Sequence, residues 1–157
     1  MDTVDERAPC AGEMRPHATI FVARVTAHNR LPLDHSVRSL GVVDFLVEGL
    51  RKGGADREGA PDALFTLGAY VGEVLVRRAG AVWVDFDAAQ RAYFGQPVGV
   101  RMPDGRVWDP LGKVVNRFEV GGPGKSLQIF YLMLHGRARR RPEERGVRSP
   151  MPRPAAV

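Results

Sequence analysis

The chain has 157 residues and 44% apolar content, which supports one globular domain with a substantial core rather than two. A single cysteine, Cys10, excludes a disulfide framework and a cysteine-based zinc site. The formal net charge is +5, and residues 136–157, with seven Arg and two Glu, account for all of it, so the rest of the chain is neutral overall.

The two ends of the chain differ from its middle. Residues 1–17 are polar, include two prolines and predict a flexible N-terminal arm. Residues 18–135 are expected to form a single α+β domain, followed by a disordered Arg- and Pro-rich tail over 136–157. The acidic start lacks a signal-peptide pattern, and no run approaches the roughly 18 uninterrupted apolar residues of a membrane span. We therefore expect a cytoplasmic protein without a membrane partner.

The first half of the predicted domain contains one candidate strand and two helices. Residues 19–26 are rich in β-branched side chains and form the candidate strand. A helix is expected over 36–51, because apolar residues recur there at helical spacing and two glycines follow. The same spacing predicts a longer helix over 62–79.

The second half predicts a small antiparallel sheet that packs against helices. Residues 81–86 alternate as a strand does, and a P-D-G turn joins a hairpin over 98–102 and 106–108. Helical spacing of apolar residues returns over 110–119 and over 126–135. Trp83 and Trp108, on different strands, are expected to pack across the sheet.

Five side chains predict where helices begin, because short polar residues satisfy the free N–H groups of a first turn. They are Ser36, Asp62, Asp87, Asp109 and Ser126. Gly68 and Gly72 lie within the helix over 62–79, where each lowers intrinsic helix stability by about 1 kcal/mol relative to Ala. We therefore expect another element to approach the backbone closely at these two positions.

Two motifs that suggest ligands are better explained structurally. G-G-P-G-K-S at 121–126 lacks the first glycine of a phosphate-binding loop, because Glu119 occupies that position, and a helix rather than a strand precedes it. Asp85 and Asp87 share one face of the strand and are weak candidates for a divalent metal. A solvent-facing carboxylate and a helix cap explain them better. No cofactor and no metal is expected.

Glu73 is the most informative polar residue, because it lies in an otherwise apolar part of its helix. One interpretation is a surface pair with Arg77, four residues later. Another is a partly buried carboxylate that pairs with Lys113 or Arg117, or with a ligand, in a polar cluster that includes Tyr70. A structural pair is favoured over a catalytic base. Asp44 raises the same question, since no cation lies three or four residues away.

The Arg-rich end of the chain is a second candidate binding region. Its first arginines are Arg137, Arg139, Arg140 and Arg141. Several arginines in a row can neutralise phosphates, and such binding depends strongly on salt. Aromatic side chains are absent between them, however, and Pro and Glu dilute the charge. A solvated tail is therefore favoured over a nucleic-acid-binding one.

The order of the motifs resembles that of a group of bacterial domains of unknown function, frequent in actinobacteria. These domains combine a G-x-Y/F-x-G-E helix, a Trp-bearing strand and an N-P-x-x-K-x-x-x-R helix. The matching segments here are L-D-H-S-V-R-S-L-G-V-V-D (33–44), G-A-Y-V-G-E (68–73), A-G-A-V-W-V (79–84), P-D-G-R-V-W-D-P-L-G-K-V-V-N-R-F (103–118) and S-L-Q-I-F-Y (126–131). Asp109 stands where the group tends to have Asn. The resemblance covers about two thirds of the chain, implies an α+β fold and brings no activity with it.

Three functions are compatible with these features. The leading one is a non-enzymatic binding or interaction module, of an accessory or immunity type, with a protein partner, because no catalytic motif is visible and the basic region lies outside the domain. The second is association with nucleic acid through the tail. The third is a small enzyme that uses Glu73 with Tyr70 or Lys113, which would require a concave site joining their two helices.

Overall fold

The structure is a computed structural model that describes residues 9–29, 33–53, 60–122 and 125–139. Within these ranges the chain forms the predicted α+β fold, with helices and a small antiparallel sheet. The helices are η1 (Ala11–Glu13, a 3-10 turn), α1 (Met14–Asn29), α2 (Ser39–Gly53), α3 (Ala60–Ala79), α4 (Ala88–Phe94), α5 (Pro110–Val120) and α6 (Leu127–Arg139). The strands are β1 (Val82–Asp85), β2 (Val98–Arg101) and β3 (Val107–Trp108).

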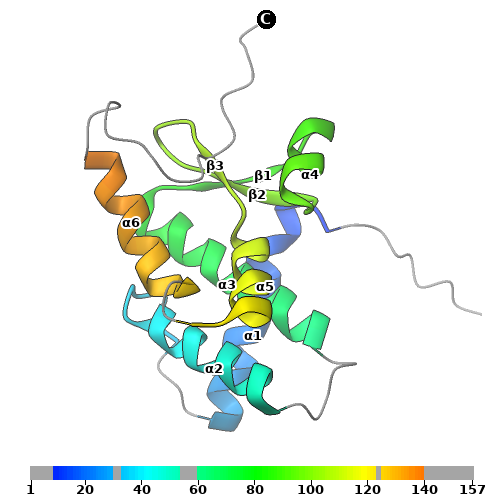
Figure 1. The fold of residues 1–157 in the computed structure, drawn as a ribbon, viewed down its shortest axis with the longest axis vertical. Coiled ribbons are helices and arrows are strands. Elements are labelled where there is room, and N and C mark those ends of the chain that lie inside the picture. The colour runs from blue at the N-terminus through cyan, green and yellow to red at the C-terminus, as the bar shows by residue number, and fades with distance from the viewer. Residues whose placement is uncertain (1–8, 30–32, 54–59, 123–124, 140–157) are drawn as a thin grey trace, which may run out of the picture.

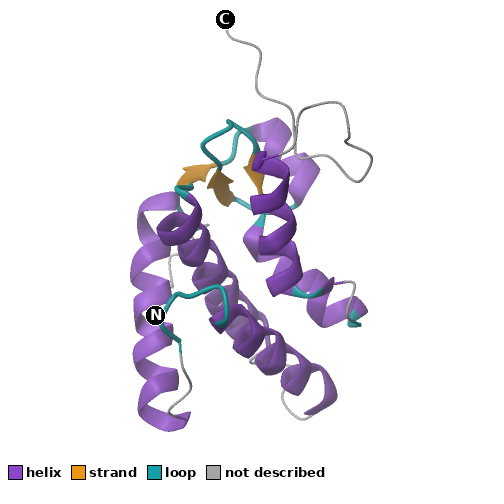
Figure 2. Cartoon of the chain, turned by 90° about the vertical axis from the view of Figure 1, so that its left-hand side faces the viewer, coloured by secondary structure: helices purple, strands orange, loops and turns teal. Residues whose placement is uncertain are grey.

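The sheet lies at one end of the helices, as Figures 1 and 2 show, and its strands follow the order β1-β2-β3. Val100 on the central strand is paired with Trp83 on one side and with Trp108 on the other. These three residues share a face of the sheet, and each packs with the main core. Both tryptophans thus help to join the sheet to the helices.

Helix α3 occupies the centre of the molecule, with α1 behind it and α5 in front in the view of Figure 1. Its side chains from Leu67 to Leu75 are buried almost without exception. The two helix glycines explain how neighbours come so close. A Cβ at Gly68 would lie 2.6 Å from the Leu111 side chain, and one at Gly72 would overlap the Trp83 ring. The close approach expected from the sequence is therefore confirmed.

The N-terminal part of the chain differs from the prediction. Residues 19–26 are not a strand but the middle of α1, and residues 11–17 are not a loose arm but form η1 and the first turn of that helix. Met14 and Ala18 are fully buried. The side chains that pack inward recur at helical spacing: Met14, Ala18, Phe21, Val22 and Val25. Packing of this face outweighs the strand preference of the β-branched residues.

Three helix boundaries also bear on the predictions. Asp62 is not an N-cap, because α3 begins at Ala60 and the carboxylate lies in the first turn, where it still favours the helix dipole. Ser36 acts as expected, since its Oγ accepts a hydrogen bond from Ser39 N (3.1 Å) ahead of α2. Helix α6 continues to Arg139, so residues 136–139 belong to a helix rather than to the predicted tail. Residues 140–157 lie outside the described ranges. None of the helices that the structure describes combines the length and apolar character needed to cross a membrane.

Candidate functional site

The Glu73 carboxylate, in the middle of α3, is completely buried and has three partners. Trp83 Nε1 on β1 donates a hydrogen bond to Oε1 at 3.0 Å. The second oxygen, Oε2, lies 3.4 Å from Arg77 Nε on the same helix and 3.5 Å from Arg15 Nε on α1. Glu73 is therefore paired with Arg77, as one interpretation of the sequence expected, and it is also buried, as the other expected.

Tyr70 lies one turn before Glu73 and belongs to a separate network that reaches the chain before α2. Its ring is fully buried, and its hydroxyl lies 2.7 Å from Ser39 Oγ and accepts a hydrogen bond from His35 N at 2.9 Å. Burial raises the pKa of the Tyr70 hydroxyl. The Tyr70 hydroxyl is thus neutral and takes part in hydrogen bonds rather than acting as a base.

His35 completes this network and has an unusual backbone. Its φ of 60° lies in the left-handed region, which costs free energy for a residue other than glycine. Tyr70 holds its N–H, Arg78 Nε donates to its carbonyl at 3.0 Å, and the imidazole lies beside the Tyr70 ring. Burial, followed by the charge of Arg77, lowers the pKa of His35. The imidazole is therefore neutral at pH 7.

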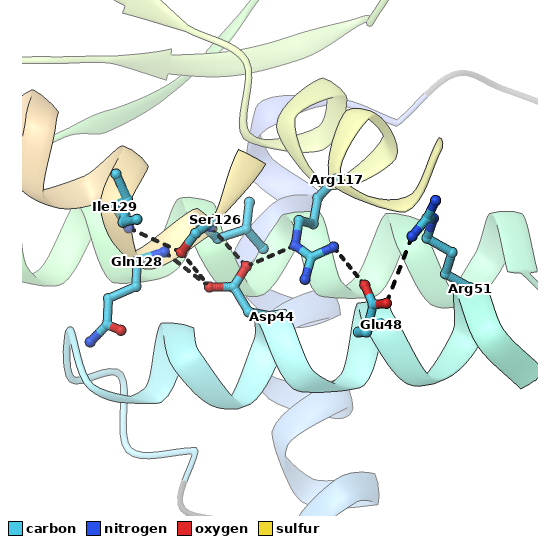
Figure 3. Close-up of polar contacts among 8 residues, drawn as sticks. Asp44, Glu48, Arg51, Arg117, Ser126, Gln128 and Ile129 are labelled. Atoms are coloured by element: carbon cyan, nitrogen blue, oxygen red, sulfur yellow. Dashed lines mark hydrogen bonds and ion pairs between the residues drawn. The ribbon is translucent and has the colours of Figure 1, made fainter. Parts of the chain in front are cut away.

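The predicted polar cluster is divided between two places in the structure. Tyr70 and Glu73 lie as described, whereas Arg117 on α5 pairs with α2 (Figure 3). Lys113, also on α5, has its Nζ 5.2 Å from the centre of the Phe130 ring and 6.0 Å from that of Trp108, at cation–π distances. Glu73 therefore pairs with Arg77, as one interpretation expected, and with Arg15 on α1 in place of Lys113 or Arg117.

Arg117 lies between two carboxylates of α2 (Figure 3). Its Nη1 donates to Glu48 Oε2 at 2.8 Å, and its Nε lies 3.5 Å from Asp44 Oδ1, an ion-pair distance without hydrogen-bond geometry. The hydrogen bond from Arg117 lowers the pKa of Glu48. Because only 10% of the Arg117 side chain is exposed, this is a buried structural ion pair that joins α5 to α2.

Asp44 has a second role that the sequence alone did not reveal. It accepts hydrogen bonds from Ser126 Oγ (2.8 Å), Leu127 N (2.8 Å) and Gln128 N (3.4 Å) at the start of α6. Ser126 also accepts from Ile129 N at 3.3 Å, as expected for a cap. The first turn of α6 is therefore capped partly from another helix, which fixes α6 against α2.

The other candidate metal and cap residues have structural partners. Asp85 Oδ1 accepts a hydrogen bond from Ala11 N, and Asp87 caps α4 through Gln90 N, both at 2.8 Å. Among the described residues, no group of three or more His, Cys, Asp or Glu side chains is arranged to hold a metal ion. The solvent-facing carboxylate and the helix cap expected at these two positions are thus present.

Asp109 caps α5, because its Oδ1 accepts from Gly112 N at 2.8 Å. Burial raises the pKa of this carboxyl to about 6, and the Gly112 hydrogen bond and the charge of Lys113 only partly offset that effect. Burial thus disfavours the ionised form of the Asp109 carboxyl that caps α5.

Two surface features of the described residues bear on binding. A groove of about 920 Å³ lies between the end of α2, the start of α3 and α5, and its lining is mainly apolar, with Leu50, Leu64, Phe65, Leu111, Val115 and Phe118. Tyr70, Glu73 and Lys113 do not line it. On α6, the exposed apolar side chains Ile129, Leu132 and Met133 share one helix face.

The candidate arginines at the end of the chain are only partly described. The backbones of Arg137 and Arg139 belong to α6, and Arg140 and Arg141 lie outside the described residues. No protein-family model, characterised protein or solved structure matches this chain.

Sequence reasoning found Glu73 and Tyr70 but missed Arg15, Ser39 and His35. Arg15 lies in the segment that was expected to be a loose arm, so the sequence did not indicate it as a partner of Glu73. The missed signal was the helical spacing of Met14 and Ala18, which places Arg15 on an ordered helix. No local pattern marks Ser39 or His35, because their partner Tyr70 is distant in the sequence.

Proposed function

We propose that this protein is a non-enzymatic interaction module that presents helix α6 to a protein partner. The partner is expected to have an apolar groove bordered by acidic side chains. The observation that carries the proposal is the outer face of α6, where Ile129, Leu132 and Met133 are all exposed at i, i+3 and i+4. Apolar side chains at this spacing are how an amphipathic helix occupies a hydrophobic groove.

The anchoring of α6 to the rest of the domain supports this role. Its inner face packs into the core through Leu127, Tyr131 and Leu134. Asp44 fixes its first turn from α2. A helix that is already formed and anchored loses little conformational entropy when its outer face is covered, so such a surface favours binding.

Charge complementarity supports an acidic partner. Arg137 and Arg139 lie in the last turn of α6, directly after the exposed apolar residues, and five more arginines follow in the sequence. The rest of the chain has no net charge. A partner with acidic side chains beside its groove would therefore be attracted to this end of the molecule in particular.

The two other functions have less support. Association with nucleic acid through the Arg-rich segment would use the same charges but leave the apolar face of α6 without a role. A small enzyme that uses Glu73 would need a carboxylate available to a substrate, whereas this one is engaged by Trp83, Arg15 and Arg77. The resemblance to bacterial domains of unknown function and a cytoplasmic location remain part of the proposal.

The test compares two substitutions at equally exposed positions in a pull-down with the full-length chain. Leu132 on α6 and Ile20 on α1 each have 55% of their surface exposed, so Leu132→Glu and Ile20→Glu introduce the same charge at matched sites. Each variant is checked for folding by circular dichroism, incubated with nuclease-treated host lysate, and its bound proteins are quantified by mass spectrometry.

We expect an acidic protein to be retained in stoichiometric amount by the wild type and by Ile20→Glu, and to be lost with Leu132→Glu. Retention by all three forms, or equal loss from both variants, would contradict the role of α6. If capture disappears on nuclease treatment and Leu132→Glu has no effect, the nucleic-acid alternative replaces the proposal.

A further inference from the structure

Arg15 and Arg77 converge on Glu73 from different helices and leave much of their side chains in solvent. Each Nε lies within 3.5 Å of the same carboxylate oxygen, Glu73 Oε2. The two Nε atoms are therefore no farther from each other than twice that distance. The exposed fractions of the two side chains are 65% for Arg15 and 46% for Arg77. One buried negative charge thus lies beneath two positive charges at the surface.

The contacts with Glu73 use only part of each arginine. In the described part of the chain, both ion pairs are made through Nε, which leaves the Nη atoms of both residues to other partners. A guanidinium group can use its fork of N–H donors to bind an oxyanion, and two forks held side by side can bind one anion together.

The dipole of α1 favours an anion at this position. Arg15 lies in the first turn of α1, where the helix dipole disfavours a cation and favours an anion. Two other carboxylates lie near the start of this helix, but Glu13 accepts from Cys10 N and Asp85 accepts from Ala11 N. Arg15 pairs with Glu73 instead.

We propose that Arg15 and Arg77 form a binding site for a phosphate group, either as the free ion or as the end of a phosphomonoester. Glu73 acts as a positioning residue: it neutralises one of the two cations and sets the direction of both guanidinium groups from below. Trp83 in turn holds the other carboxylate oxygen in place. A phosphate monoanion would balance the one remaining positive charge, and a phosphate group in either ionisation state can accept hydrogen bonds from both forks.

Trp83 provides a local probe, because its Nε1–H bonds directly to the carboxylate beneath the proposed site. The chain has two tryptophans, so two-dimensional ¹H–¹⁵N NMR spectra will contain two indole signals, and Trp108 serves as an internal control. Inorganic phosphate and phenyl phosphate are titrated separately into the full-length protein at constant ionic strength. The Arg-rich end of the chain can also attract phosphate, without specificity. The Trp83 indole signal reports on the proposed site alone, because its N–H bonds to Glu73.

We expect saturable shifts of the Trp83 indole signal with a dissociation constant on the order of 1 mM for one or both compounds. Arg15→Gln and Arg77→Gln should each weaken binding at least about tenfold, whereas Arg24→Gln, an exposed arginine further along α1, should leave it unchanged. A stronger response to phenyl phosphate would identify a phosphomonoester, and a stronger response to the free ion would identify inorganic phosphate.

The spectra of the variants show whether each remains folded, so a loss of binding can be separated from a loss of structure. An unshifted Trp83 signal with both compounds would overturn the proposal. So would binding that is equally strong in Arg15→Gln, Arg77→Gln and the wild type, or equally weakened in Arg24→Gln. The proposed protein partner of α6 is tested by different variants, and neither result depends on the other.

Discussion

Two ion-pair clusters in this molecule have opposite composition. Around Arg117, one guanidinium group with 10% exposure lies between two carboxylates of α2, and the whole arrangement joins helices. Around Glu73, one fully buried carboxylate lies beneath two arginines that are largely exposed. Both clusters satisfy a buried charge, but the buried charge is a guanidinium in the first and a carboxylate in the second. Glu48 in the first cluster also pairs with the exposed Arg51 and Lys52, whereas in the second cluster the exposed cations are themselves the partners of the buried charge. The second cluster is therefore the candidate for binding an anion.

The largest expected effect comes from breaking the Arg117 cluster. Arg117→Met keeps most of the side-chain volume but leaves Asp44 without its cation, whereas Glu48 keeps Arg51 and Lys52 as partners. Losing the charge-assisted contacts of a largely buried guanidinium typically lowers the free energy of unfolding by about 2–3 kcal/mol. Urea denaturation followed by circular dichroism measures this. A loss below about 1 kcal/mol would mean that the pair behaves like an exposed one.

A second buried carboxylate, Asp109, sharpens the comparison, because burial raises its pKa to about 6 despite the charge of Lys113. The ordinary value is 3.8, so the folded state holds the proton more tightly than the unfolded state. The free energy of unfolding should therefore decrease as the pH rises from about 4 to 6, by about 1–3 kcal/mol. Asp109→Asn keeps a capping oxygen, should stabilise the protein at pH 7 and should remove this part of the pH dependence.

The measurement is urea denaturation of wild type and Asp109→Asn at a series of pH values. The difference between the two proteins should be small near pH 4 and largest above pH 6. If Asp109→Asn destabilises the protein at pH 7, the carboxylate is the better cap there, and burial does not disfavour its ionised form.

Neutralising Glu73 should cost less than breaking the Arg117 cluster. Glu73→Gln keeps an oxygen that can accept from Trp83 Nε1 but removes the charge that pairs with two arginines. Because both arginines are solvated, they are not left buried, and the expected loss is about 1–2 kcal/mol in the free energy of unfolding. Urea denaturation beside Arg117→Met tests the order of the two effects. A greater loss for Glu73→Gln would contradict it.

The smallest effect is expected from the exposed side of the Glu73 cluster. Arg15→Gln should lower the free energy of unfolding by no more than about 1 kcal/mol, because exposed partners of an ion pair contribute little and are screened by salt. The same denaturation experiment at low and high salt measures it. A loss of several kcal/mol would assign Arg15 a structural role and weaken the case for a phosphate site.

The sequence predicted most of the helices, the hairpin and the α+β class, because their signals are local. Helical spacing identified the elements that became α2, α3, α5 and α6, and the caps at Asp87, Asp109 and Ser126 lie where expected. The segment that forms α1 was assigned wrongly. Its β-branched residues favour a strand locally, whereas burial of Met14 and Ala18 against α3 favours a helix.

The candidate site divides in the same way. The sequence by itself determined that Glu73 and Asp44 are carboxylates in apolar helices that need partners, since an unpaired charge cannot be buried cheaply. The tertiary structure decided which cations and N–H groups pair with these two carboxylates. Helix α1 packs against α3, and both α5 and α6 pack against α2. Side-chain pairing over long sequence separations depends on how helices are placed, and local patterns contain no information about that placement.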